Sequence, residues 1–262
     1  MRFTVEGRGA YEDLRARYAR ALKFIFQNNR LTGTVVLFWI LAALAGVLYE
    51  RHLIGPGPFD PLYYTPTGTV MENFLHVVQT NLRVEFQTIA EGFLLAFGPT
   101  FGLLANIFEG FAFDYQLLAH NGIHTFLVLY VPFLPLEYVF GFISALLGFL
   151  VFLKFFNLEK NTIVSTVTAF LFGAGVLVSY EGIYTNLYVL LPYDAMMIAL
   201  LCFLIYRNNR GANSPFSKNT LMNRFKKLDV KMIVWAYVLI IVPLIIIAGI
   251  FESLSIVYFP IF

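Results

Sequence analysis

The chain has 262 residues, of which 59 % are hydrophobic, 18 % aromatic and 13 % charged, with a net charge of +2 and a mean hydropathy of +0.73. Soluble domains contain about 45–50 % apolar and about 25 % charged residues, so the composition argues against a soluble domain. The apolar residues form blocks of about 18–24, the length at which a helix crosses about 30 Å of hydrocarbon. Because the blocks lack the alternation of barrel strands, we expect an all-α, polytopic transmembrane helix bundle.

Residues 1–31 are predicted to form a basic amphipathic helix on the cytoplasmic side. Apolar side chains recur at helical spacing at Leu14, Tyr18 and Leu22, with arginines between them. Such a helix can lie on an anionic membrane surface with its basic side chains toward the headgroups. It can equally serve as a docking surface for a cytoplasmic partner protein.

The remaining residues, 32–262, are predicted to form a single transmembrane domain of about six to seven spans. The first span covers roughly residues 32–50. Gly- and Pro-rich sequence then predicts an external loop at 51–80, because prolines interrupt helices. Further spans are expected at 82–105, 136–153, 162–180, 186–206 and 232–251.

The segment at 122–134 is too short for a regular span. Pro132 and Pro135 interrupt it, which predicts either a half-helix or one arm of a proline-broken segment covering 122–153.

The distribution of basic residues predicts the topology. Of the 18 Lys and Arg residues, seven lie in residues 1–30 and another seven in residues 207–231, while Lys154 and Lys160 share one short loop. The positive-inside rule places all three regions in the cytoplasm. We therefore expect a multi-pass cell-membrane protein with a cytoplasmic N-terminus, a basic cytoplasmic loop at 207–231 and an external C-terminus.

Several polar side chains lie inside or beside the apolar blocks and are candidates for a functional site. An ionisable residue at membrane depth costs about 2.5–3.5 kcal/mol on insertion scales, so it is expected to face protein or water. The candidates from this argument are Glu85, Glu91, Asn106, Glu137 and Glu252.

Glu137 is the leading candidate. It shares a helical face with Gly141, Ser144 and Gly148, small residues that allow helices to approach closely. The two prolines before it free backbone carbonyls, as in the broken helices that line transporter cavities. Glu137 is therefore either a structural lock between two helices or a titrating group on a polar path.

Two further pairs have helical spacing. Asn106 and Gly110 favour a close helix crossing with an amide hydrogen bond. His120 and His124 lie four residues apart, but the HExxH motif is absent, so we expect no metal there.

The chain also lacks GxSxG, P-loop and GxGxxG motifs. We therefore expect neither enzymatic activity, nor a cofactor, nor a nucleic-acid partner.

Taken together, "TNLRVEF…GLLANIFEGF…VPFLPLEYVFGFISALLG…IFESLSIVYFP" resembles the stage II sporulation protein M family of integral membrane proteins. The positions that match the family pattern are Asn81, Asn106, Gly110, Pro132, Glu137, Gly141, Gly148, Glu252 and Pro260. The sequence departs from the pattern where Phe133 and Leu134 replace a His and a Gly. Glu252 and Pro260 are also further apart than in the family.

The resemblance implies a non-enzymatic membrane scaffold or subunit of a larger complex. Its partners would be the lipid bilayer and proteins that bind the basic cytoplasmic segments. Some members of the family lie near transporter genes, so the alternative is a permease- or channel-like subunit with a polar path through Glu137. The small residues at 141–148 and 173–175 can support a homo-oligomer or the interior of one bundle.

Overall fold

The structure, a computed structural model, describes residues 5–49, 68–104, 111, 115, 118, 122–124, 131–181, 187–210 and 218–258. Their regular secondary structure is entirely helical. The main helices are α1 (Val5–Ile25), α2 (Asn29–Tyr49), α3 (Val70–Ala90), α4 (Phe97–Leu103), α6 (Leu134–Phe155), α7 (Thr162–Glu181), α8 (Leu187–Asn208), α9 (Lys218–Lys227), α10 (Val230–Ala236) and α11 (Val242–Tyr258).

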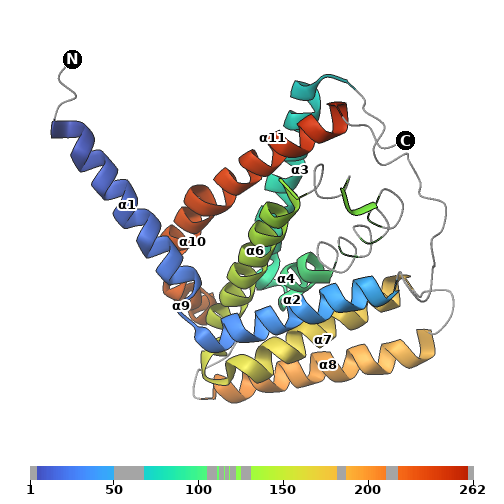
Figure 1. Cartoon of the computed structure of the whole chain (residues 1–262). Helices are drawn as coiled ribbons and strands as arrows, with labels where there is room; N and C mark the ends of the chain where they lie inside the picture. Colours follow the sequence, from blue (N-terminus) through green and yellow to red (C-terminus); the bar gives the residue numbers. More distant parts are fainter. Residues whose placement is uncertain are drawn as a thin grey trace.

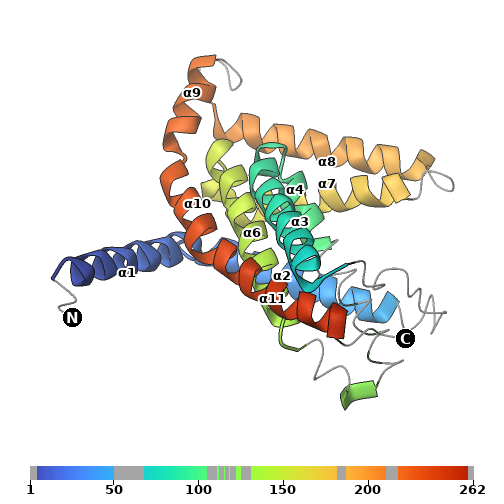
Figure 2. The same cartoon turned by 90° about the horizontal axis from the view of Figure 1, so that it is seen from above.

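Three helical stretches in the described part of the chain are long and apolar enough to cross a membrane. They are Asn29–Leu48, Leu134–Phe155 and Val230–Ser255, and each overlaps a predicted span. Since about 20 apolar residues suffice to cross a bilayer, these stretches indicate a membrane protein. Helices α7 and α8 form where two further spans were predicted, and they pack side by side (Figures 1 and 2).

Helix α6 lies in the middle of the bundle, between α2, α3, α4 and α11 (Figure 1). Nearly every side chain from Phe140 to Phe155 is buried, including Phe149 and Phe152 at 0 % exposure. A helix that is apolar on all sides is stable only when it is enclosed on all sides, so α6 forms the core. Pro135 lies in its first turn, where a missing N–H removes no helical hydrogen bond. It therefore starts α6, directly after a turn at residues 131–133. Residues 125–130 lie outside the described part of the chain, so the proline-broken segment expected at 122–153 stays a prediction.

Helix α3 begins at Val70, twelve residues before the expected span at 82–105, and it shortens the predicted external loop. Thr69 accepts a hydrogen bond from the Glu72 amide, and the Glu72 side chain accepts one from the Thr69 amide at 2.7 Å. These hydrogen bonds also hold the pKa of the Glu72 carboxyl below its usual value. The reciprocal pair is a capping box, which satisfies amides that the first helical turn leaves free. Residues 70–80, predicted as loop, are thus helical.

The predicted span at 82–105 is wrong, because the chain reverses in the middle of it. After α3 a 3₁₀ turn runs over Glu91–Phe93. Leu95 and Ala96 then adopt φ values of 54° and 62°, the left-handed region that ends a helix. Helix α4 returns along α3 and packs against α6 and α7.

Glycines allow this reversal to pack tightly against α6 and α7. A Cβ on Gly148 would lie 2.6 Å from the Thr88 carbonyl oxygen, and one on Gly173 would lie 2.7 Å from Thr100. A Cβ on Gly92 would collide with the Gly148 carbonyl. The small-residue faces at 141–148 and 173–175 are therefore occupied, at Gly148 and Gly173, by contacts within this chain.

At one end of the bundle, α9 lies within the segment predicted as a basic loop at 207–231. The Arg224 side chain, 4 % exposed, donates a hydrogen bond to Asn209 Oδ1 at 3.0 Å. Asn209 Nδ2 in turn donates to the Phe156 carbonyl, and Asn161 bonds Asn208. Burial lowers the pKa of the Arg224 guanidinium. This network fastens the ends of α6 and α8 to α9.

Helix α1 forms within residues 1–31, where a helix was predicted, and its placement on the cytoplasmic side stays a prediction. It projects away from the bundle in both views (Figures 1 and 2) and packs on α10 near its C-terminal end. Ala21 and Ile25 are buried, whereas Leu14 and Tyr18 remain exposed.

Replacing Gly148 by alanine is expected to destabilise the bundle by about 1–3 kcal/mol, because the added methyl has no room beside a rigid carbonyl. Gly33→Ala on α2 is the matched control, since nothing lies within 4 Å of the added methyl. That change should stabilise the protein by about 0.5–1 kcal/mol. The free energy of unfolding in mixed micelles measures both, and equal effects would contradict the close packing at Gly148.

Candidate functional site: a carboxyl seam between three helices

Three buried or half-buried carboxyl groups lie along the contact of α3, α6 and α11: Glu85, Glu137 and Glu252. We call this set the carboxyl seam. Helices α3 and α11 run antiparallel, because Tyr237 contacts Leu82 while Gly249 lies against Val78. A Cβ on Gly249 would lie 2.8 Å from Val78, so the two backbones are close.

Glu85 on α3 is the most deeply buried of the three, with 1 % exposure. Its carboxyl faces the Ser144 hydroxyl on α6, yet neither Glu85 Oε2 nor Ser144 Oγ has a partner in hydrogen-bond geometry. Leaving a buried polar group unpaired costs about 1–3 kcal/mol. The seam therefore contains buried oxygen atoms that have no hydrogen-bond partner among the described residues.

Tyr237 lies beside Glu85 but bonds elsewhere. Its hydroxyl donates to the Leu82 carbonyl at 2.7 Å, and its ring packs edge-on against Phe86 at 6.0 Å. Tyr237 begins a π turn that ends at Ile241, just before Pro243. Pro243 has no N–H to donate, and the wider turn accommodates this gap in the helical hydrogen bonds.

Glu137 and Glu252 form the second polar contact of the seam, between α6 and α11. Their carboxyl groups lie next to each other. A hydrogen bond between them forms when one carries a proton, because an ionised carboxylate only accepts. Glu252 Oε2 has no hydrogen-bond partner. The neighbouring Ser253 hydroxyl does not supply one, since it donates to the Gly249 carbonyl at 2.6 Å.

The two polar contacts lie on one face of α6. Glu137 and Ser144 are seven residues apart, which is about two turns and about 10.5 Å along the axis. The seam is thus a row of polar groups: the Glu137–Glu252 pair at one level and Glu85 with Ser144 at the next.

The other predicted site residues do not join the seam. Glu91 lies at the α3–α4 reversal, where a Cβ on Gly98 would be 3.1 Å from its Oε2. Asn81 on α3 is half-buried, Gly141 is buried, and Pro132 and His124 are exposed. Four predicted residues lie outside the described part of the chain: Asn106, Gly110, His120 and Pro260. Among the described residues, no three His, Cys, Asp or Glu side chains are grouped as metal ligands would be.

The sequence predicts the three carboxyl groups of the seam but not the polar side chains beside them. The spacing predicts Ser144 only as a small residue on the Glu137 face of α6, and nothing in the sequence pattern singles out Tyr237. Pro243 in the middle of an apolar block was the available signal for an irregular turn near Tyr237.

A cavity of about 670 Å³ lies between α2 and α6, on another face of α6. Its walls are apolar and include Trp39, Tyr138 and Phe142. None of the three seam carboxyls lines it. This cavity therefore offers no polar route to Glu137.

No family model matches the sequence, and no curated protein or solved structure is detectably similar to it.

The Glu137–Glu252 contact predicts a measurable coupling. Glu137→Gln can still form a hydrogen bond with Glu252 and should change the free energy of unfolding by no more than about 1 kcal/mol. Glu137→Leu leaves the Glu252 carboxyl without this partner and should lower the free energy of unfolding by about 1–3 kcal/mol. In a double-mutant cycle, the leucine variants at both positions should show about 0.5–3 kcal/mol of coupling.

The matched control cycle pairs Glu91→Leu with Glu252→Leu. Glu91 lies at the far end of α3, so its coupling to Glu252 should stay within about 0.5 kcal/mol. Coupling as small as this between Glu137 and Glu252 would contradict the contact between their carboxyl groups.

Proposed function

We propose that the protein is a non-enzymatic, multi-pass membrane protein, similar to the stage II sporulation protein M family, that acts as a scaffold or subunit of a larger complex. The observation that supports this proposal is the contact between the Glu137 and Glu252 carboxyl groups, where α6 packs against α11. A buried polar contact of this kind fixes which helices pair and in which register.

In this proposal α7 and α8 also cross the bilayer, and the N-terminus lies in the cytoplasm. Basic residues gather in the last turns of α1, α6, α8 and α9, at Lys23, Lys154, Arg207 and the Arg224–Lys227 group. Cations there interact favourably with helix C-termini. They also agree with the positive-inside rule for a single cytoplasmic face.

The partner-binding element in this proposal is α9 together with α1. Arg224 fixes α9 to the bundle through Asn209. Phe225 packs against Phe93 and Phe155 at 5.3 and 5.1 Å, yet its side chain remains 47 % exposed, and Met222 is 51 % exposed. A rigidly held helix with exposed apolar and basic side chains suits recognition of another protein.

A permease-like subunit is the second candidate. It is favoured by the unpaired oxygens of Glu85 and Glu252 on one seam, because intramembrane carboxyls are common in proton and ion pathways. In that case the seam would need to admit water or an ion during turnover.

A photo-cross-linking amino acid at Met222 tests the scaffold proposal. In membranes of the source organism it should yield one discrete cross-linked protein. The control position is Leu37 on α2, which is equally exposed at 52 % but faces lipid in this proposal and should give lipid adducts alone. Identical product patterns at the two positions would overturn the assignment of α9 as the partner-binding element.

Proteoliposomes separate the two candidates. With a pH gradient imposed, the scaffold proposal predicts that the purified protein dissipates it no faster than protein-free liposomes. The permease candidate predicts faster dissipation that is lost in Glu137→Gln and retained in Glu91→Gln, since Glu91 lies off the seam. A pH-sensitive dye inside the liposomes reports either outcome.

A further inference from the structure

Three cations converge on one tryptophan where α1 meets α10. The guanidinium carbons of Arg17 and Arg20 lie 5.2 and 5.3 Å from the centre of the Trp235 ring, and Lys231 Nζ lies 4.8 Å from it. We call these four residues the Trp235 basic cluster. Helical spacing produces it: Arg17 and Arg20 are one turn apart on α1, and Lys231 lies one turn before Trp235 on α10.

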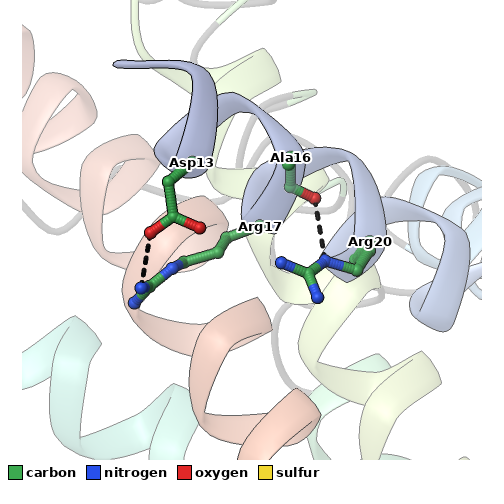
Figure 3. A network of polar contacts seen from close by, with 4 residues as sticks. All are labelled: Asp13, Ala16, Arg17 and Arg20. Carbon is green, nitrogen blue, oxygen red and sulfur yellow. Dashed lines mark hydrogen bonds and ion pairs between the residues drawn. The ribbon is translucent and has the colours of Figure 1, made fainter. Parts of the chain in front are cut away.

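The described residues supply too little negative charge to balance this cluster. Asp13 forms an ion pair with Arg17, and this contact lowers the pKa of the Asp13 carboxyl (Figure 3). Arg20 donates from Nε to the Ala16 carbonyl at 3.2 Å (Figure 3) and is attracted by the same Asp13. Among the described residues, no carboxylate lies within ion-pair distance of Arg20 or Lys231. A ring face attracts cations only weakly, while three like charges repel one another. With one carboxylate and three cations, the cluster has a net positive charge that favours binding of an anion.

The surroundings of the cluster identify the kind of anion. Exposed apolar side chains flank it on both helices, with Leu14 at 51 %, Tyr18 at 43 % and Val234 at 50 % exposure. Trp235 lies near the beginning of the apolar stretch Val230–Ser255. Tryptophan, basic and apolar side chains together are characteristic of the boundary between headgroups and acyl chains. A water-soluble anion would need none of the apolar contacts.

We propose that the Trp235 basic cluster binds the headgroup phosphate of an anionic phospholipid. Arg17, Arg20 and Lys231 donate to the phosphate oxygens, and the apolar side chains of α1 and α10 contact the upper part of the acyl chains. Arginine suits this role because its planar fork can bind two phosphate oxygens at once. The lipid thereby fixes α1 at the membrane surface.

Tryptophan fluorescence tests the proposal directly, because the chain has two tryptophans. Trp39→Phe leaves Trp235 as the single reporter, and it removes an indole N–H that has no hydrogen-bond partner. The full chain is placed in vesicles that contain phosphatidylglycerol or phosphatidylcholine brominated near the headgroup, at equal mole fraction. Brominated phosphatidylglycerol should quench Trp235 more strongly. Neutralising each cation should reduce this preference by up to about fivefold, since one basic residue near an anionic surface contributes about that factor.

Charge-matched variants provide the control. Replacing Arg17, Arg20 and Lys231 by glutamine should equalise quenching by the two lipids. The same replacement at Arg207, Lys226 and Lys227, exposed cations of α8 and α9, should leave the preference intact. The single variant Lys231→Gln, together with size-exclusion and circular dichroism checks, separates loss of binding from loss of folding.

Three outcomes would overturn the proposal. Equal quenching by both lipids in the Trp39→Phe protein would point to an acidic protein segment as the partner of the cluster. Abolition of the preference by inorganic phosphate, exchanged for chloride at constant ionic strength, would assign the site to free phosphate. Loss of the preference in the α8 and α9 control would show that overall charge, rather than this cluster, attracts the lipid.

Discussion

At Gly92 and Gly148 the backbones of α3 and α6 touch, and this contact sets the spacing of the whole bundle. Neither glycine has room for a Cβ, because the carbonyls of Gly148 and Thr88 occupy that space. With the backbones this close, α3 turns back into α4 against α6, and the reversal packs against α7 through Gly173. Well-packed interiors absorb added volume poorly, so the spacing of these helices is fixed by the smallest side chains.

That spacing also determines what the carboxyl groups contact. Glu85 lies one turn before Thr88, whose carbonyl adjoins Gly148, and it therefore faces Ser144 on the next turn of α6. Two turns further back, Glu137 meets Glu252 on α11. The seam joins three helices by polar contacts in a region that is otherwise apolar. Satisfied contacts of this kind specify one arrangement of helices, whereas the unpaired oxygens are places where water, an ion or a proton can be accommodated.

The exposed elements are separate from this core. Helix α9 is attached through Arg224 and the Phe93–Phe155–Phe225 aromatic cluster. Helix α1 is attached through its C-terminal half and the cations around Trp235. In the proposed scaffold, partners and lipid would bind these appended basic helices without disturbing the seam.

The helical membrane class, the positions of α1, α2, α6 and α8, and Glu137 as a candidate residue could all be predicted from the sequence. Apolar length, basic clusters and helical spacing are local properties, so they are readable along the chain. The capping box at Thr69 and Glu72 was equally readable and gives the start of α3. The reversal at Leu95 and Ala96 could not be predicted, because non-glycine residues adopt positive φ there and no local rule indicates it. The pairing of Glu137 with Glu252 was likewise undecided by the sequence, because it depends on which distant helices the glycine contacts bring together.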